Sequence, residues 1–144
     1  MTREDKELLL KDLCARLPYK PIVHIDDCGI WNLRGIDHDD SAELRDRVIV
    51  WHGENYPSSK NSFPIINCKP YLFPLSSMTE EQKKEYNYWK HEVPVCRYEY
   101  GDVVEEIELY DSPESFEYLI ENHFDYRGLI ERGLAIDATG LNIY

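Results

Sequence analysis

The residues best suited to chemistry stand close together near the C-terminal end of the chain: His123, Asp125, Tyr126 and Arg127. An arginine fork binds phosphate or carboxylate through two parallel hydrogen bonds, an imidazole titrates near neutral pH, and a tyrosine ring stacks on planar ligands. The stretch therefore indicates a small polar binding site. A structural interpretation accounts for it as well, with Asp125 capping a helix, Tyr126 packing in the core and Arg127 paired with an acid.

A second candidate lies in an extended stretch, where Lys69 and Tyr71 flank a proline. Such a segment presents a cation and an aromatic ring on a rigid backbone and could contact a ligand or a partner. Ordinary packing at the edge of a sheet is the competing interpretation. Lys69 and Tyr71 thus complete the set of candidate ligand-binding or partner-binding residues.

Metal ligation and catalysis receive little support from the residue pattern. The chain has four cysteines but no CxxC pair, and His24 and Cys28 lack the second closely spaced pair of a structural zinc site. The acidic run at residues 37–40 lacks the ligand order and the glycine of an EF-hand loop, so we interpret it as a solvated turn. No nucleotide-binding or hydrolase motif occurs. We therefore assign no metal, no cofactor and no catalytic residue, and keep an enzyme as an alternative.

The charge balance restricts the partners. With 16 Lys and Arg against 28 Asp and Glu, the net charge is −12, which opposes direct binding to nucleic acid and suits a basic partner surface. Eleven tyrosines and three tryptophans indicate either a protein interface or a thin core filled by large side chains. We find no membrane span and no signal-peptide pattern, and we expect free thiols in a cytoplasmic protein.

The elements that must position these residues form an α+β pattern, predicted as a single domain over residues 1–144. Thr2 and Asp5 predict a capping box for an N-terminal helix, with Asp12 facing water and Cys14 in the core. About five or six mostly antiparallel strands follow. Those at residues 22–25 and 30–36 form a first predicted hairpin, two more lie at 44–51 and 63–68, and a second hairpin is predicted at 95–100 and 103–110. Residues 52–62 read as an exposed loop.

Three further helices are predicted. One is a surface helix running from Thr79 to about residue 90, and two lie at the C-terminal end, capped by Ser112 and Asp125. Gly133 would end the last helix, and residues 134–136 would form a final short strand. In the hairpin we expect Val103, Ile107 and Leu109 to face inward.

Three blocks carry a family resemblance: KELLLKDLCARLPY at residues 6–19, KPYLFPLSSMTEEQKKEY at 69–86 and NHFDYRGLIERGLAI at 122–136. They cover about a third of the chain and resemble a family of small uncharacterised proteins encoded in phages and prophages of Bacteroides-type gut bacteria. Phe73 departs from that pattern, which has a basic residue there. The resemblance implies an accessory protein acting in the bacterial cytoplasm during infection or lysogeny, and it implies no catalytic residue.

These observations lead to a main hypothesis and two alternatives. The main hypothesis is a non-enzymatic phage or prophage protein that binds a host protein, with counter-defence as its setting. The first alternative is a sponge for a small nucleotide signal, which needs basic residues such as Arg34, Lys69 or Arg127 to converge with aromatic rings in a pocket or at the interface of an oligomer. The second is an acidic DNA mimic that inhibits a DNA-binding enzyme.

Overall fold

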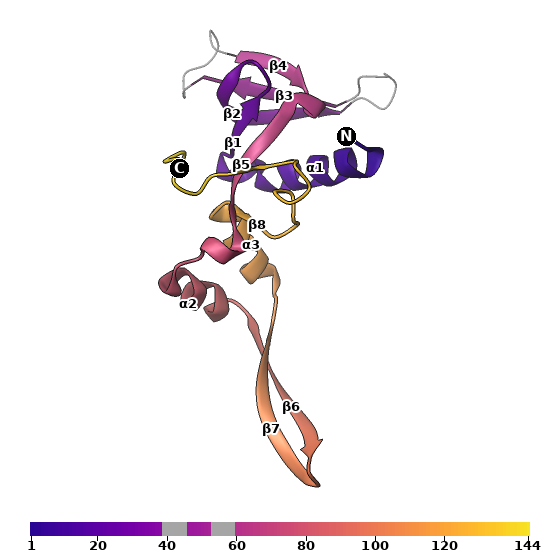
Figure 1. Cartoon of the computed structure of the whole chain (residues 1–144), viewed down its shortest axis with the longest axis vertical. Helices are drawn as coiled ribbons and strands as arrows, with labels where there is room; N and C mark the ends of the chain where they lie inside the picture. The colour runs from indigo at the N-terminus through magenta and orange to yellow at the C-terminus, as the bar shows by residue number, and fades with distance from the viewer. Residues whose placement is uncertain (39–45, 53–59) are drawn as a thin grey trace. The chain divides into compact units, whose positions relative to one another are not determined.

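The computed structural model describes residues 1–38, 46–52 and 60–144. The prediction of an acidic turn at residues 37–40 was wrong for Asp37 and His38, which pair with the next strand as the end of a strand. The rest of that turn, the start of the strand predicted at 44–51 and most of the loop predicted at 52–62 lie outside the described residues. The chain folds into two compact units (Figure 1): unit 1 comprises Met1–Ser77 and His123–Tyr144, and unit 2 comprises Met78–Asn122. The α+β class, the N-terminal helix and the mostly antiparallel strands are confirmed. One domain over residues 1–144 stays a prediction.

Unit 1 is built on a seven-stranded sheet with the order β4-β3-β2-β1-β5-β8, and β9 also pairs with β5. The pairings from β4 to β5 are antiparallel, whereas β8 and β9 both run parallel to β5. The strands are β1 (Ile22–Ile25), β2 (Gly29–His38), β3 (Asp46–Trp51), β4 (Lys60–Pro64), β5 (Cys68–Pro74), β8 (Phe124–Asp125) and β9 (Ile136–Asp137). The described residues contain nine strands in all, more than predicted, because several are short.

Helix α1 (Arg3–Arg16) begins with the predicted capping box between Thr2 and Asp5. Its Leu9 and Leu13 enter the core of unit 1, together with apolar side chains of the sheet. Leu10 and Leu17 are partly buried and pack against this core. The prediction was wrong for two residues of this helix, since Asp12 is fully buried and Cys14 is exposed. The buried stripe includes Asp12 because this carboxylate pairs with another buried side chain one turn further along the helix.

Short 3₁₀ helices separate some of the predicted elements. They are η1 (Leu17–Tyr19), η2 (Ile65–Asn67) and η3 (Leu75–Ser77). The fourth strand predicted at residues 63–68 was wrong, since η2 interrupts it and buries Ile65 between β4 and β5. The stretch after η2, expected to be extended, is strand β5, which pairs with β1, β8 and β9.

The second C-terminal helix, predicted to start at Asp125, does not form. Residues 124–125 are strand β8, and the chain then turns through Gly128 and Gly133, whose φ angles are +74° and +73°. A single helical turn is present, in which the Arg132 N–H donates to the Gly128 carbonyl at 3.3 Å, and it ends at Gly133 with the Leu134 N–H donating to the Leu129 carbonyl at 2.9 Å. The final strand is accordingly β9 at Ile136–Asp137, later than predicted.

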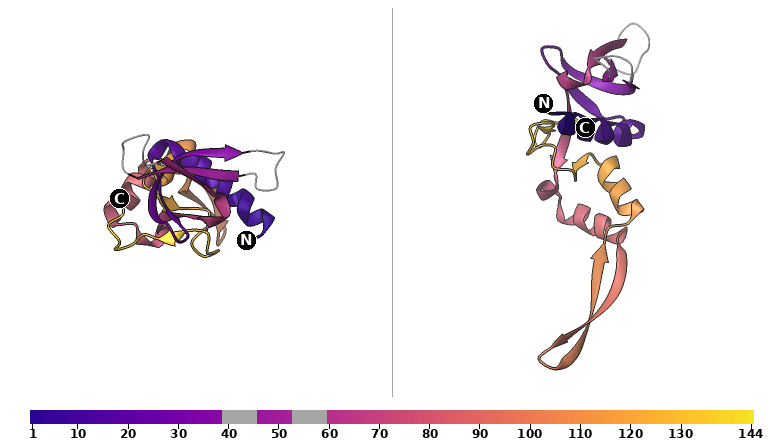
Figure 2. Two further views of the ribbon diagram at one scale, coloured as in Figure 1. Left: turned by 90° about the horizontal axis from the view of Figure 1, so that it is seen from above. Right: turned by 90° about the vertical axis from the view of Figure 1, so that its right-hand side faces the viewer.

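Unit 2 consists of two helices and a hairpin. Helix α2 (Glu80–Tyr88) begins at Thr79, and helix α3 (Pro113–Glu121) begins at Ser112, both as predicted. Strands β6 (His91–Glu99) and β7 (Asp102–Tyr110) form the predicted second hairpin, which the right view of Figure 2 shows as a two-stranded ribbon. The helices are joined by Tyr118, whose hydroxyl donates to Glu85 at 2.9 Å and whose ring lies 6.2 Å from that of Tyr86.

Candidate functional site

The predicted polar corner lies in unit 1, and Asp125 has a structural task there. Its carboxylate accepts hydrogen bonds from the backbone N–H groups of Leu129 at 3.0 Å and Ile130 at 2.9 Å. These bonds satisfy amides of the turn that replaces the predicted helix. Asp125 is buried, so both carboxylate oxygens are committed to the fold rather than presented to a ligand.

Arg127 also faces the protein. Its Nε lies 3.3 Å from an oxygen of Asp12, and its guanidinium lies 4.8 Å from the centre of the Tyr126 ring. The other oxygen of Asp12 pairs with Arg16 Nε at 2.7 Å, and an Arg16 terminal nitrogen donates to the Phe124 carbonyl at 2.7 Å. Asp12 and Arg16 are 0% exposed. The corner is therefore a buried ion network that ties α1 to β8.

Sequence reasoning missed Asp12 and Arg16 as members of this network. The available signal was their spacing of four residues, which places an acid and a base on one helical face. That spacing is also common on solvated helix surfaces, and only the packing of residues 124–127 distinguishes the two cases.

His123 stacks on Tyr144, with ring centres 3.6 Å apart and planes 11° from parallel. Burial, and then the positive charge of Arg16, lower its pKa to about 4. The imidazole is therefore neutral near pH 7. His123 also has a φ of +63°, a conformation that few residues other than glycine adopt.

Lys69 and Tyr71 lie on β5, on one face of the sheet with His24. Lys69 is opposite His24 in the register, and the Tyr71 hydroxyl lies 3.3 Å from His24 Nδ1. The Tyr71 carbonyl accepts a hydrogen bond from the Tyr144 hydroxyl at 2.9 Å. Tyr144 thus bridges the backbone of Tyr71 to the ring of His123. The structure therefore links the predicted group at residues 123–127 to the predicted pair of Lys69 and Tyr71 through Tyr144, which the sequence analysis did not single out.

A different surface stands out in unit 2. Ten of the sixteen large hydrophobic side chains exposed among the described residues lie in this unit, which has about a third of those residues. The β6–β7 register places six apolar or weakly polar side chains on one side of the ribbon, which we name the apolar face. They are Pro94, Cys96, Tyr98, Val103, Ile107 and Leu109.

The members of the apolar face are exposed to an unusual degree. Tyr98 is 82% exposed, Ile107 67% and Val103 58%. The expectation that Val103, Ile107 and Leu109 face inward was wrong, because the hairpin forms a sheet of its own with two strands. The opposite side carries most of the charged residues of the hairpin, with Arg97 paired to Glu106.

Two hollows lie between the helices of unit 2. The aromatic hollow, about 470 Å³, is lined by Lys84, Glu85, Tyr88, Trp89 and Tyr118. The acidic hollow, about 260 Å³, is lined by Trp89, Glu114, Glu117, Tyr118 and Glu121. Trp89 is 46% exposed and lies in both hollows, two residues before the hairpin begins. Aromatic side chains and carboxylates thus stand beside each other in this unit.

No protein-family model, curated protein or solved structure matches the chain. None of the described helices is long and apolar enough to cross a membrane. Across residues 1–38, 46–52 and 60–144 no group of three His, Cys, Asp or Glu side chains is arranged to hold a metal ion.

Proposed function

We propose that this is a binding protein that docks onto a partner protein through the apolar face of its β6–β7 hairpin. The observation that carries the proposal is the exposure of Tyr98, Val103 and Ile107 on one side of a two-stranded ribbon. Large contiguous apolar surfaces on soluble proteins mark interaction sites. A bare two-stranded ribbon is also only marginally stable in water, so covering one face with a partner stabilises it.

The charges of the hairpin define the chemistry of the partner. Residues 91–110 hold six acidic side chains against one arginine, Arg97. On the apolar face itself the charged residues are Glu92 and Glu105. A fitting partner therefore carries an apolar strip bordered by Lys and Arg. A second copy of the chain fits poorly, because its own hairpin would bring the same negative charges.

The hollows of unit 2 extend the same chemistry. Trp and Tyr are the residues that most often dominate binding energy at interfaces, and Trp89 and Tyr88 are both exposed. In the acidic hollow, Trp89 stands beside three glutamates, an arrangement that suits a lysine or arginine of the partner. Together with the resemblance to phage and prophage proteins, this supports a host protein as the partner and counter-defence as the setting.

The test begins with a tagged wild-type bait in a lysate of a Bacteroides-type host and continues with the purified captured protein. The decisive variant is Ile107→Ser, which removes a side chain that is 67% exposed and leaves the helices untouched. Ile30→Ser is the matched control, since Ile30 is a strand isoleucine of unit 1 that is 51% exposed. We expect Ile107→Ser to weaken binding by about 30-fold, the effect of one hot-spot residue, and Ile30→Ser to change it little.

Salt provides an independent measurement. A partner with a basic border associates more slowly as ionic strength rises, because the attraction between opposite charges is screened. Equal affinity for wild type and Ile107→Ser would show that the hairpin is not part of the interface. An association rate independent of salt would contradict the basic border that we propose for the partner.

A further inference from the structure

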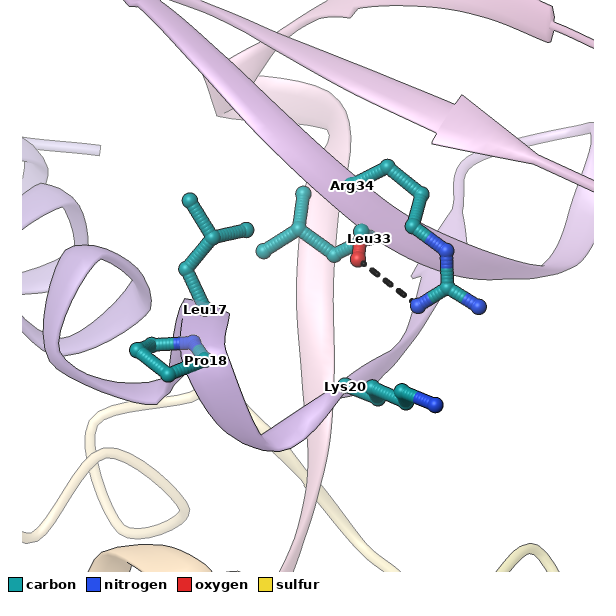
Figure 3. A pocket seen from close by; sticks show the side chains of 5 residues that line it. All are labelled: Leu17, Pro18, Lys20, Leu33 and Arg34. Atoms are coloured by element: carbon teal, nitrogen blue, oxygen red, sulfur yellow. Dashed lines mark hydrogen bonds between the residues drawn. The ribbon is translucent and has the colours of Figure 1, made fainter.

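Unit 1 contains a pocket of about 420 Å³ lined by Leu17, Pro18, Lys20, Leu33 and Arg34 (Figure 3). Its walls come from two places in the sequence, the end of η1 and the middle of β2. Figure 3 shows the charged ends of Lys20 and Arg34 on one side and the Leu17 and Pro18 side chains on the other. The pocket therefore has a cationic end and an apolar end.

The backbone explains why these side chains meet. Lys20 follows η1 in the left-handed conformation, with φ of 54°, so the chain reverses there toward the sheet. The Leu33 N–H donates to the Pro21 carbonyl at 3.0 Å, which fixes β2 against this reversal. The β2–β3 register shifts between Leu33 and Gly35, so Arg34 occupies a bulge. Bulges re-aim side chains and are frequent beside binding sites.

Neither cation is neutralised by an acid within the described part of the chain. Arg34 has a weak bond of 3.5 Å to the Leu33 carbonyl and lies over the Trp51 ring at 5.7 Å. Lys20 forms no ion pair with any residue that the structure describes. Lys20 and Arg34 therefore form a locally cationic site among the described residues of a protein whose net charge is −12. Leu33, which is 0% exposed, supplies an apolar floor.

We propose that this pocket binds a small organic anion, with its phosphate or carboxylate between Lys20 and Arg34 and its apolar or aromatic body against Leu17 and Pro18. A guanidinium and an ammonium together bind such groups through charge-assisted hydrogen bonds. The volume lies within the range of small-molecule sites, which is about 300–1,000 Å³. The site lies in unit 1 and does not depend on the docking surface proposed for unit 2.

The test is calorimetric titration of the full chain with three classes of anion. The first is inorganic phosphate, the second comprises nucleoside monophosphates and cyclic nucleotides, and the third comprises aliphatic and aromatic carboxylates. The variants are Lys20→Gln and Arg34→Gln. Lys11→Gln is the control, because it removes the same charge from an exposed position of unit 1 outside the pocket.

We expect at least one organic class to bind more tightly than inorganic phosphate, because the apolar end contributes. Each pocket variant should weaken that binding by about tenfold, the effect of losing one charge-assisted hydrogen bond, while Lys11→Gln should not. Arg34 also contacts the Trp51 ring, so Arg34→Gln could disturb the fold. If that variant unfolds, Lys20→Gln alone decides the test. Absence of binding by every class, or equal binding by Lys20→Gln and Lys11→Gln, would overturn the proposal.

Discussion

Replacing Arg16 by leucine tests whether the buried ion network holds unit 1 together. The substitution removes the 2.7 Å partner of Asp12 and the donor to the Phe124 carbonyl, at a position that is 0% exposed. Among the described residues, Asp12 would then keep Arg127, at 3.3 Å, as its remaining cation. Removing one member of a buried pair costs about 3–5 kcal/mol, because the remaining charge is left without compensation.

The magnitude is large enough to measure directly. Domains are stable by about 5–15 kcal/mol, and a urea dependence of about 2 kcal/mol per molar places the expected midpoint shift near 2 M. Equilibrium unfolding in urea, followed by circular dichroism and tryptophan fluorescence, gives both midpoint and slope. Arg3→Leu is the matched control, since Arg3 pairs with Glu7 at the same spacing in the same helix but is 92% exposed. It should change stability little.

A double variant separates pairing from packing. Asp12→Leu together with Arg16→Leu removes the fully buried pair and leaves Arg127, whose side chain is 19% exposed, and we expect it to recover part of the lost stability. About 1 kcal/mol should remain lost, because the Phe124 carbonyl still lacks its donor. An Arg16→Leu protein within about 1 kcal/mol of wild type would refute the reasoning, as would a double variant no more stable than the single one.

Three further predictions concern unit 1 and the thiols. Because His123 stays neutral down to about pH 4 in the folded chain but protonates below about 6.5 in the unfolded chain, stability should fall as pH drops through this window, by about 1–2 kcal/mol since solvent reaches part of the ring. His123→Asn should flatten urea midpoints measured between pH 7 and 4, and an unchanged slope would contradict this origin. Asp125→Ala should cost about 2 kcal/mol in the same unfolding assay, because the Leu129 and Ile130 amides lose their acceptors, whereas the exposed Asp26→Ala should cost little. Cys68 is buried with a pKa raised to about 12, so a thiol reagent should modify it only after unfolding, and its reaction in the native protein would disprove its burial. The three exposed thiols, Cys14, Cys28 and Cys96, should react in the native state.

The local parts of the fold were predictable because their signals lie within a few residues. Thr2, Thr79 and Ser112 each accept a hydrogen bond from the amide three residues on, which is why their positions mark helix starts. The second hairpin was predictable from Gly101, whose φ of +86° meets the demand of a tight turn.

The parts that failed depend on contacts between distant residues. Asp125 reads as a helix cap, yet its two acceptor bonds hold a turn, and residues 124–125 pair with β5 instead. Asp12 reads as solvent-facing until Arg16 and Arg127 are known to surround it. In the hairpin, the alternation correctly indicated two faces, but no sequence pattern shows whether an apolar face has anything to cover it.

The candidate sites divide in the same way. His123, Asp125, Tyr126 and Arg127 are near neighbours in sequence and were found as a group, although their bonds serve the fold. Lys20 and Arg34 come together only through a chain reversal and a strand bulge, and neither feature leaves a recognisable motif.

The parallel pairing of β5 with β8 has a consequence for how this chain is made. The chain leaves unit 1 after β5 and returns to it at β8, on either side of residues 78–122. These two strands pair with each other, and the Phe73 N–H donates to the His123 carbonyl at 2.8 Å beside them. Unit 2 is thus an insertion within unit 1, built from pairings that are local in sequence. On the ribosome, its hairpin and helices can form before the last strands of the sheet emerge. A hairpin of different sequence grafted between α2 and α3 would leave the β5–β8 pairing unchanged, so the docking surface that we propose could be altered without redesigning the sheet.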